Sequence, residues 1–265
     1  FCNVDGLFPN HHPDPSKPEN LQDLINDVVN GDSELGLAFD GDADRLGVVT
    51  KQGEIIYPDR LMMMFADDLL ARHKSAEIIY DVKCSRDLGD WISQRGGKPK
   101  MWKTGHSLIK AEMKRSEILL GGEMSGHFFF NERWYGFDDG IYAGARLLEY
   151  LSKQLSVDSS FNELPKSIST PELQIQCQEG ENFTLTEKLK TSSHFDSALQ
   201  KITIDGIRVE YPSGFGLARA SNTTPTIVLR FEADTQSGLT RIMTDFKNAL
   251  ADEAPHLSFP TLDKY

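Results

Sequence analysis

The sequence predicts an α/β protein that ends in an α+β domain, and two observations lead to this prediction. Between residues 55 and 165, short apolar runs typical of strands alternate with longer amphipathic runs typical of helices, as in α/β domains. After residue 165 this alternation stops, and two strand-like runs follow each other around Asp205-Gly206, as in an antiparallel hairpin. We therefore expect three segments. They are the remnant of one α/β domain over residues 1–54, a complete α/β domain over residues 55–165, and a C-terminal α+β domain with a mostly antiparallel sheet over residues 166–265.

The first segment is expected to contain one helix and three strands. Its Pro-rich opening predicts an irregular start. Apolar residues spaced along one face then predict a helix with Asn20 as its N-cap and Asn30-Gly31 at its end. The apolar runs that follow predict a buried strand over residues 35–39 and two further strands over residues 46–50 and 54–57.

The second segment is expected to begin with a helix that Pro58 opens and that runs through Leu69. Strands and helices then alternate along the chain. The expected strands cover residues 77–82, 100–103, 118–122 and 127–130, and the expected helices cover residues 87–94, 107–115 and 139–151. In such a fold the loops after the carboxyl ends of the strands carry the chemistry.

The third segment is expected to follow a linker. The stretch from Ser156 to Pro171 is rich in Ser, Pro and Asp, which is typical of a linker. Beyond it, the expected strands cover residues 172–178, 201–205, 207–211 and 226–231, and the expected helices lie near residues 184–190 and 238–251.

The chain is acidic, which limits the classes of partner it can have. Its 265 residues include 28 Lys plus Arg and 40 Asp plus Glu, giving a net charge of −12. Residues 1–54 hold 11 of these acids and 3 of the bases, so they carry most of the excess negative charge. This argues against nucleic acid or an anionic membrane as a partner, because both require a basic surface. Three scattered cysteines, no signal-peptide pattern and no apolar run of membrane-spanning length favour a cytoplasmic protein.

The densest chemical signal is the loop Asp40-Gly41-Asp42-Ala43-Asp44-Arg45 between two expected strands. Three carboxylates at alternate positions of a tight loop can converge on one hard cation, and Mg²⁺ prefers such oxygens together with water or a substrate phosphate. Arg45 beside them predicts that a phosphate meets the metal there, because a guanidinium binds phosphate oxygens bidentately. A solvated acidic turn is the alternative interpretation.

Two other acidic motifs fit this loop less well. An EF-hand requires Gly where Arg45 stands and a bidentate Glu where Lys51 stands. A phosphatase of the haloacid-dehalogenase type also places Asp-x-Asp after a strand, but it requires a small hydroxyl or aliphatic residue where Arg45 stands. The loop therefore favours a Mg²⁺ site next to a phosphate.

Two further loops combine polar groups that can bind a sugar phosphate. Arg219-Ala220-Ser221-Asn222-Thr223-Thr224-Pro225 offers a guanidinium, hydroxyls and an amide, which form an anion cradle, although a polar β-turn has the same composition. Gly121-Gly122-Glu123-Met124-Ser125-Gly126-His127 presents Glu123 and Ser125, which can bind vicinal sugar hydroxyls, although a Gly-rich hairpin also explains this loop.

Two shorter loops also follow expected strands. One of them contains Lys83 and Arg86, and the other places His106 just before a helix, where backbone N–H groups attract phosphate. A single His in a loop is often only a surface or capping residue, so His106 alone does not decide the chemistry.

Together these loops resemble the α-D-phosphohexomutases, and they most resemble the bacterial phosphomannomutase/phosphoglucomutase branch. The match runs along the whole chain in the family's order, from the metal loop through the loops with Lys83, His106 and Glu123 to the phosphate loop. Glu123-Met124-Ser125-Gly126-His127 resembles the sugar loop of this branch, whereas phosphoglucosamine mutases tend to carry Gln in place of Met. Ser221-Asn222-Thr223-Thr224-Pro225 resembles its phosphate loop, where the glucosamine branch usually has Ser-Gly-Thr.

The resemblance implies an isomerase that interconverts the 1- and 6-phosphates of glucose and mannose through a bisphosphate and an enzyme phosphoserine. It implies Mg²⁺ bound by Asp40, Asp42 and Asp44, with Arg45 supporting the transferring phosphoryl group. It implies general acid/base work at Lys83 and His106, with His127 nearby. The implied substrate-binding residues are Glu123 and Ser125 for the sugar hydroxyls, and Arg219, Ser221, Asn222 and Thr223 for the phosphate that does not react.

One part of the family pattern is missing from the sequence. The family's phosphoserine lies in a Thr-x-Ser-His-Asn-Pro loop, and no such loop occurs in these 265 residues. Because the chain also starts with Phe1 instead of Met, we expect a C-terminal fragment of a four-domain protein, inactive as a mutase by itself and monomeric at full length. The residues leave two other functions open, a Mg²⁺-dependent phosphatase with Asp40 or Asp42 as nucleophile and a non-catalytic sugar-phosphate-binding module.

Overall fold

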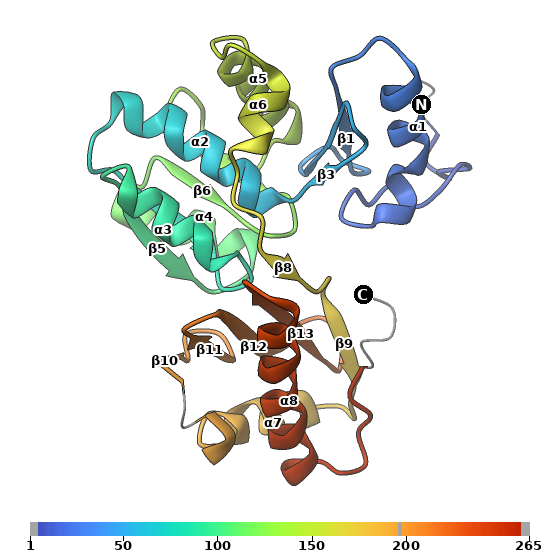
Figure 1. The fold of residues 1–265 in the computed structure, drawn as a ribbon, viewed down its shortest axis with the longest axis vertical. Helices are drawn as coiled ribbons and strands as arrows, with labels where there is room; N and C mark the ends of the chain where they lie inside the picture. Colours follow the sequence, from blue (N-terminus) through green and yellow to red (C-terminus); the bar gives the residue numbers. More distant parts are fainter. Residues whose placement is uncertain (1–4, 196–197, 261–265) are drawn as a thin grey trace. The chain divides into compact units, whose positions relative to one another are not determined.

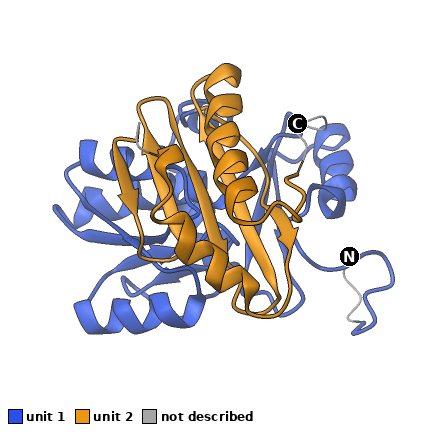
Figure 2. Ribbon diagram, turned by 90° about the horizontal axis from the view of Figure 1, so that it is seen from below, with its two compact units in different colours: residues 1–165 blue, residues 166–265 orange. Residues whose placement is uncertain are grey.

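A computed structural model describes residues 5–195 and 198–260, and the chain divides into two compact units, residues 1–165 (unit 1) and residues 166–265 (unit 2). Figure 1 shows the course of the chain, and Figure 2 colours the two units. Each unit has an apolar core of its own. The two units do not test the expected boundary at residue 54, so the division into three segments stays a prediction.

Unit 1 begins with a helix and a small antiparallel sheet. A 3₁₀ turn, η1 (Pro18–Leu21), leads into α1 (Gln22–Asn30), which ends at Gly31 as expected. The sheet has the order β1 (Leu35–Phe39), β2 (Leu46–Thr50) and β3 (Ile55–Ile56). β1 and β2 therefore form a hairpin, and the loop that connects them is the predicted metal loop, residues 40–45.

Two details of this region differ from the expectation. The expected N-cap at Asn20 is wrong, because Pro18 opens a 3₁₀ turn that runs directly into α1. The Asn20 side chain instead donates to Asp14 O at 3.0 Å. β1 is a strand as expected, but it is not buried along its length, because it lies at the edge of the sheet and leaves Phe39 37% exposed.

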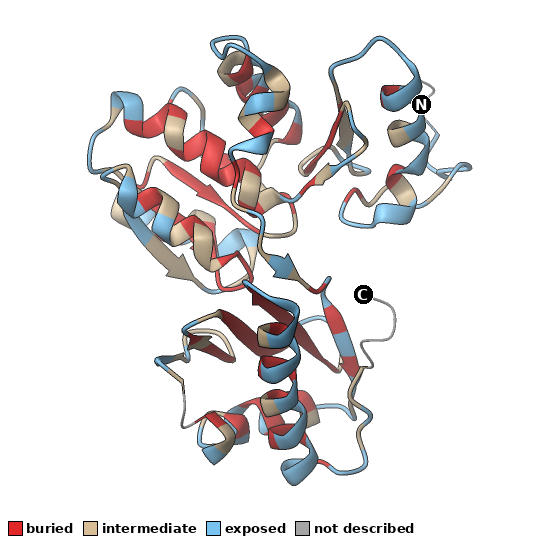
Figure 3. Ribbon diagram, in the orientation of Figure 1, coloured by how far each residue is buried: buried red, intermediate tan, exposed pale blue. Residues whose placement is uncertain are grey.

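The rest of unit 1 confirms the expected α/β fold. Its sheet has the order β5 (Lys98–Trp102), β4 (Glu77–Asp81), β6 (Leu120–Gly122) and β7 (Phe128–Phe130), in which β7 alone runs antiparallel to its neighbour. The longer helices are α2 (Pro58–Arg72), α3 (Arg86–Gln94), α4 (His106–Ser116) and α5 (Gly140–Leu151). α2 is buried without interruption from Leu61 to Ala66 and forms much of the core (Figure 3).

The parallel arrangement gathers three predicted loops at one edge of this sheet. The loops that contain Lys83, Gly105 and Glu123 follow the carboxyl ends of β4, β5 and β6. Because the carboxyl ends of parallel strands meet at the same edge, loops that are far apart in the sequence converge there. His106 is the first residue of α4, not the residue before it as expected, because Gly105 takes the cap position.

The stretch from Ser156 to Pro171 contains the boundary between the two units, after Pro165, but it is not the unstructured linker that its composition predicts. The stretch contains α6 (Val157–Asn162), whose N-cap Ser156 accepts a hydrogen bond from Ser159 N at 3.3 Å, and also β8 (Ile168–Ser169). Phe161 of α6 is 4% exposed and belongs to the core of unit 1. Tertiary packing of one apolar side chain therefore outweighs the polar composition of the stretch.

Unit 2 is an antiparallel sheet on which two helices pack. The strand order is β10-β11-β12-β13-β8, and β9 also pairs with β13. The remaining elements are β9 (Leu173–Gln176), α7 (Glu181–Leu189), η2 (Ser193–Phe195), β10 (Gln200–Ile202), β11 (Ile207–Tyr211), β12 (Gly214–Ala220), β13 (Thr226–Ala233) and α8 (Gln236–Glu253). Within the described parts of both units, no helix has the length and apolar character needed to cross a bilayer.

The central strand β12 was not expected, whereas the hairpin beside it was. β10 and β11 pair antiparallel around Asp205-Gly206, which confirms that hairpin. β12 reads Gly-Phe-Gly-Leu-Ala-Arg-Ala and has no β-branched residue, so its composition does not favour a strand. A Cβ at Gly216 would lie 2.3 Å from the ring of Phe246, so α8 packs directly on the backbone of this strand.

Candidate active site

The predicted metal loop is a tight connection between β1 and β2. Asp40, Asp42 and Asp44 each bring one carboxylate oxygen within 4.8 Å of the others. Ala43 N donates to Asp40 O at 3.2 Å, and Ala43 adopts a left-handed conformation with φ of 61°. A residue other than glycine in this conformation costs about 1–3 kcal/mol, so the surrounding structure must hold the loop in this shape.

Arg45 holds the first carboxylate of the loop. Its backbone N–H donates to Asp40 Oδ1 at 3.0 Å, and its Nε donates to Asp40 Oδ2 at 2.7 Å. Its Nη1 lies 3.2 Å from Asp14 Oδ1. The guanidinium is therefore fixed beside the three carboxylates of the metal loop.

The carboxylates of the loop differ in their electrostatic surroundings. Burial works to raise the pKa of Asp40, but the hydrogen bonds from Arg45 outweigh it and hold this pKa below its ordinary value. Burial raises the pKa of Asp44, and the neighbouring charges of Asp40 and Asp42 add to the rise while His127 opposes it. The loop therefore carries more negative charge than its own cation balances.

The start of α5 packs directly on the metal loop. Gly140 N donates to Ala43 O at 2.9 Å, and a Cβ at position 140 would lie 2.6 Å from Arg45 O. Glycine is therefore needed for this close approach. Asp139 caps the same helix by accepting from Tyr142 N at 2.8 Å, so the helix end that supports the loop is itself fixed.

The predicted sugar loop is a tight turn from β6 to β7 that is bonded to the metal loop. Glu123 N donates to His127 O at 2.9 Å, and Gly126 N donates to Glu123 O at 3.1 Å. Leu46 N donates to Gly126 O at 3.1 Å, and Arg45 and His127 form a β-bridge. Backbone hydrogen bonds therefore hold the ends of the two loops side by side.

Glu123 is a buried carboxylate in this turn, with 2% of the residue exposed. Its Oε1 accepts from Gly105 N at 2.6 Å, which ties the sugar loop to the start of α4. Burial, followed by the nearby Asp81 carboxylate, raises the pKa of Glu123, although the hydrogen bond from Gly105 opposes the rise. Ser125 lies two residues further along the same turn and is half-buried.

Asp81, at the end of β4, links the loops along this edge of the sheet. It is fully buried, and its Oδ2 accepts from Thr104 Oγ1 at 3.1 Å. Its Oδ1 accepts from Cys84 Sγ at 3.2 Å and from Met124 N at 3.3 Å. Lys83 Nζ lies 3.9 Å from Asp81 Oδ2, and the lysine side chain is only 7% exposed. One carboxylate thus joins the three loops that follow β4, β5 and β6.

The two predicted histidines meet at a shared carboxylate. The rings of His106 and His127 stack with their centroids 5.3 Å apart. Asp138 Oδ2 lies 3.0 Å from His106 Nδ1 and 3.1 Å from His127 Nδ1, and Asp138 Oδ1 accepts from Lys110 Nζ at 2.7 Å. His127 Nδ1 also lies 3.5 Å from Asp44 Oδ1, so this cluster continues into the metal loop.

In unit 2 the predicted phosphate loop connects β12 and β13. Arg219 lies at the end of β12, is 6% exposed, and donates from Nε to Asp205 Oδ2 at 3.0 Å. Ser221 Oγ accepts from Thr223 N at 3.4 Å, which organises the turn. Asn222 and Thr223 are exposed. The turn therefore presents an amide and hydroxyls next to a buried guanidinium.

Asn182 braces the phosphate loop from α7. The residue is 1% exposed, and its Nδ2 lies 3.1 Å from Ser221 O, 3.3 Å from Thr226 O and 3.5 Å from Thr224 O. One buried amide therefore contacts the backbone at both ends of the loop.

The structure brings the predicted site residues of unit 1 onto neighbouring, mutually bonded loops; these residues are Asp40, Asp42, Asp44, Arg45, Lys83, His106, Glu123, Ser125 and His127. In unit 2 it gathers Arg219, Ser221, Asn222 and Thr223 around one turn. Sequence reasoning did not single out Asp81, Asp138 or Asn182. The pair Asp138-Asp139 before an expected helix was a signal for Asp138, whereas nothing local distinguishes Asn182.

Three family models match consecutive parts of the chain. They are described as phosphoglucomutase/phosphomannomutase domains. The alpha/beta/alpha domain II matches residues 1–53, the alpha/beta/alpha domain III matches residues 57–168, and the C-terminal domain matches residues 172–249. The three matches cover most of the chain in the order of the family's domains.

Known relatives extend beyond this chain. It is 61% identical to a phosphoglucomutase of Neisseria gonorrhoeae over 261 residues, which are 98% of this chain and 56% of that protein. A crystal structure of a phosphoglucomutase/phosphomannomutase family protein from Burkholderia thailandensis is 56% identical with a TM-score of 0.92, covering 98% of this chain and 55% of that chain. A more distant structure shares the fold at 15% identity and a TM-score of 0.58, over 82% of this chain and 48% of that chain. It is the N-acetylphosphoglucosamine mutase of Aspergillus fumigatus in complex with GlcNAc-6P and magnesium.

The chain thus spans about half the length of these relatives. With three domain models matching in order and an identity of 61% to a phosphoglucomutase, this chain belongs to the phosphoglucomutase/phosphomannomutase family.

Proposed function

We propose that this chain supplies the metal-, sugar- and phosphate-binding residues of a phosphohexomutase acting on glucose and mannose phosphates. In this reaction an enzyme phosphoserine gives its phosphoryl group to the free hydroxyl of a hexose monophosphate. The resulting bisphosphate turns end for end, and its other phosphoryl group returns to the serine. The observation that carries the proposal is that the metal loop, Glu123 and His127 lie on bonded loops of one unit.

The donor set of the metal loop fits Mg²⁺. Asp40, Asp42 and Asp44 offer only oxygen atoms, within 4.8 Å of one another, and Mg²⁺ prefers carboxylate oxygens completed by water and substrate phosphate. The raised pKa of Asp44 reflects burial and the repulsion that a bound cation would relieve. Bound by these residues, Mg²⁺ would neutralise charge on the phosphoryl oxygens.

Arg45 is proposed to bind the transferring phosphoryl group beside the metal loop. Asp40 and Asp14 hold its guanidinium, and 23% of its side chain remains exposed. Phosphoryl transfer depends mainly on positioning and charge neutralisation, which a fixed guanidinium provides.

His127 is proposed to move the proton of the sugar hydroxyl, and His106 and Lys83 are the other candidates. An imidazole at this place takes the proton when the hydroxyl accepts the phosphoryl group and returns it in the reverse half-reaction. Its Nδ1 lies 3.5 Å from Asp44 Oδ1, which places His127 next to the loop where the phosphoryl group is transferred.

Glu123 and Ser125 are proposed to bind the sugar hydroxyls at C3 and C4. Glucose and mannose differ only at C2, so such a site accepts both sugars. These two hydroxyls nearly exchange places when the sugar turns end for end, so one site serves both orientations. The phosphate that does not react is proposed to bind the loop of unit 2, through Arg219, Ser221, Asn222 and Thr223.

A mutase assay tests the proposal. It uses glucose 1-phosphate, catalytic glucose 1,6-bisphosphate and Mg²⁺, and it follows the formation of glucose 6-phosphate. Because these 265 residues contain no Thr-x-Ser-His-Asn-Pro loop, we expect no turnover from this chain alone. We expect turnover when it is joined to a polypeptide that carries the phosphoserine loop of the family.

Variants and products separate this proposal from the alternatives. Asp44→Asn must lose turnover, whereas Asp252→Asn, which removes an exposed carboxylate of unit 2, must keep it. Release of inorganic phosphate in place of glucose 6-phosphate would support the phosphatase. Stabilisation by ligand without turnover in either preparation would support the non-catalytic binding module.

A further inference from the structure

Asp138 is a mostly buried carboxylate that faces three cationic or imidazole groups. Its side chain is 7% exposed. Its Oδ2 lies 3.0 Å from His106 Nδ1 and 3.1 Å from His127 Nδ1, and its Oδ1 lies 2.7 Å from Lys110 Nζ. Burial works to raise the pKa of Asp138, but these groups outweigh it and hold the pKa well below its ordinary value, so the carboxylate stays ionised.

The composition of this cluster also suits a transition metal, but a fixed cation is already present. His106, His127 and Asp138 each bring one ligand atom within 4.8 Å, a donor set typical of transition metals. Lys110 Nζ, however, lies 2.7 Å from Asp138 Oδ1 and 3.3 Å from His106 Nδ1. Because an ammonium group occupies this position, the cluster is better explained as a carboxylate that orders two imidazoles.

The position of His127 determines which of its nitrogens carries the proton. Nδ1 is buried between Asp138 Oδ2 at 3.1 Å and Asp44 Oδ1 at 3.5 Å. The shorter contact has the distance of an ion pair, although its angle departs from that of a regular hydrogen bond. Ionised carboxylates only accept hydrogen bonds, so a neutral His127 is most stable with its proton on Nδ1. The lone pair is then on Nε2, at the opposite side of the ring.

The residues that follow Asp138 support the metal loop. Asp139 caps α5, and Gly140 N donates to Ala43 O at 2.9 Å. Three consecutive residues, 138 to 140, therefore hold both the imidazole of His127 and the backbone of the metal loop. Such a segment fixes the distance between the proton-accepting nitrogen and the phosphoryl-binding loop.

We propose that Asp138 is the positioning residue of His127, keeping the proton on Nδ1 so that Nε2 can take the proton of the sugar hydroxyl. The inference rests on the proposed function, in which His127 moves that proton. Asp138 does not touch the sugar in this account and acts only through His127.

Asp138→Asn tests the inference because it keeps the shape of the side chain and removes its charge. Lys110 has only donors, so it takes the single oxygen of the new amide, and the amide NH₂ group then faces His127. Asp44 Oδ1, on the other side of Nδ1, is 3.5 Å away, which is beyond the usual length of a hydrogen bond. His127 Nδ1 therefore accepts from the nearer amide group, and its proton moves to Nε2. Long-range ¹H–¹⁵N spectra of the full chain at alkaline pH should show Nδ1–H for His127 in the unmodified chain and Nε2–H in D138N.

The mutase assay, on the chain joined to a polypeptide that carries the phosphoserine loop, gives the second readout. D138N should lower kcat by about 10²–10⁴-fold while KM changes less than about twofold, because a proton-transfer step is lost and sugar binding is not. In D138N/K110M the amide can turn its oxygen toward His127, so the Nδ1–H tautomer should return and kcat should recover about tenfold or more. Asp252→Asn is the matched control, because it removes an exposed carboxylate 2.8 Å from His194 in unit 2 and should change neither readout.

The inference would be overturned by any of three results. These are an unchanged His127 tautomer in D138N, a kcat within about threefold of the unmodified protein, and an activity loss that only follows the unfolding of unit 1. If no preparation turned over hexose phosphate, the proposed function would fail. The NMR comparison would still decide whether Asp138 sets the proton of His127.

Discussion

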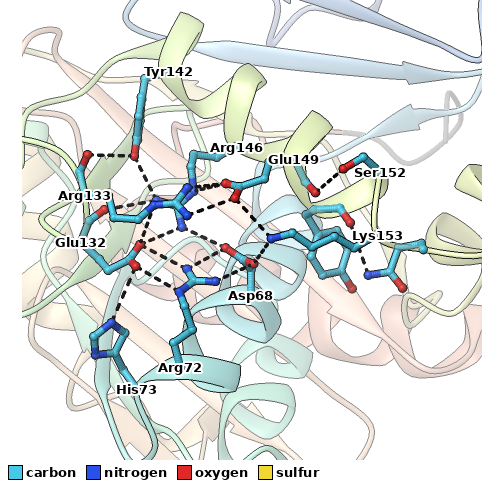
Figure 4. A network of polar contacts seen from close by, with 12 residues as sticks. Asp68, Arg72, His73, Glu132, Arg133, Tyr142, Arg146, Glu149, Ser152 and Lys153 are labelled. Carbon is cyan, nitrogen blue, oxygen red and sulfur yellow. Dashed lines mark hydrogen bonds and ion pairs between the residues drawn. The ribbon is translucent and has the colours of Figure 1, made fainter.

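Unit 1 contains two clusters of charged side chains that both combine Asp, Glu and Arg but differ in how far their carboxylates are neutralised. We call the first the Arg146 cluster; it lies between α2, α5 and the chain after β7 and includes Asp68, Arg72, Glu132, Arg133, Arg146, Glu149 and Lys153 (Figure 4). We call the second the metal-loop cluster; it includes Asp40, Asp42, Asp44, Arg45, Glu123, His127 and Asp138.

In the Arg146 cluster three carboxylates face four cationic side chains, so each carboxylate has a cationic partner. Arg146 is 3% exposed and lies 2.9 Å from both Asp68 Oδ2 and Glu132 Oε2. Arg72 donates to both oxygens of Asp68 at 2.9 Å. Burial works to raise the pKa of Asp68, but these hydrogen bonds outweigh it and hold the pKa far below its ordinary value. The carboxylates of this cluster therefore need no ligand.

The metal-loop cluster leaves part of its negative charge unbalanced. The pKa values of Asp44 and Glu123 are raised by burial and by neighbouring carboxylates. Arg45 is bonded mainly to Asp40, so it does not offset the charge of the other loop carboxylates. The comparison shows that every carboxylate of the Arg146 cluster has a cationic partner, whereas Asp42 and Asp44 in the metal loop have carboxylate neighbours whose charge a bound cation would neutralise.

The largest expected effect is on the free energy of unfolding of unit 1, when the Arg146 cluster loses one of its carboxylates. Asp68→Asn should lower the free energy of unfolding of unit 1 by about 3–5 kcal/mol, because the buried Arg146 then loses a charged partner. Urea unfolding followed by tryptophan fluorescence measures this, since Trp91, Trp102 and Trp134, the three tryptophans of the chain, all belong to unit 1. Asp90→Asn, on the exposed side of α3, is the control and should change stability by less than about 0.5 kcal/mol. A loss below about 1 kcal/mol in Asp68→Asn would show that the cluster is not balanced as described.

The next largest effect should be stabilisation of unit 1 by Mg²⁺, which should depend on the metal-loop cluster and not on the Arg146 cluster. Mg²⁺ at 100 times its dissociation constant should stabilise unit 1 by about 2.7 kcal/mol, and EDTA should reverse this gain. Asp44→Asn should abolish the gain, whereas Asp68→Asn should keep it from a lower starting stability. Thermal unfolding with and without Mg²⁺ measures both. Equal responses of the two variants would remove the distinction between the clusters.

The smallest changes in stability should come from replacing one Glu in each cluster by Gln, and they should have opposite signs at pH 7. The hydrogen bond from Arg133 lowers the pKa of Glu149 from 4.5 to about 2, so this carboxylate stabilises the fold above about pH 4.5 and loses that contribution as the pH falls toward 2. Glu149→Gln should therefore cost at most about 1 kcal/mol at pH 7, because solvent screens the pair, and the cost should vanish near pH 2.

Glu123→Gln is the matched substitution in the metal-loop cluster. A raised pKa means that the charged form of Glu123 destabilises the fold at pH 7, and this cost is absent below pH 4.5, the ordinary pKa of the group. Glu123→Gln should therefore raise stability at pH 7 and have no effect below about pH 4. Urea unfolding of both variants across this pH range compares them, and a loss of stability at pH 7 in both would contradict the account.

Much of the fold could be predicted because its signals are local. The apolar spacing in α2 and the run of strands and helices from Glu77 to Leu151 need no knowledge of the tertiary structure. The elements that were missed depend on packing. β12 has glycines that admit Phe246, and α6 is anchored by one buried side chain, Phe161, in a polar stretch. Neither contact can be inferred from a short window of sequence.

The candidate site, like the fold, has features that the sequence predicts and features that only folding decides. The sequence by itself determined the family resemblance and the loops that carry the chemistry, because residue types at fixed spacing within a loop, such as Asp40-x-Asp42-x-Asp44, stay neighbours in any fold. Only the tertiary structure decided the partners of each charge. Asp68 and Asp44 are equally acidic in the sequence, but Asp68 is bonded to Arg146, 78 residues away, whereas Asp44 faces other carboxylates and His127. Charge balance in a buried cluster depends on groups that folding brings together, so Asp138 became visible only when His106, Lys110 and His127 met around it.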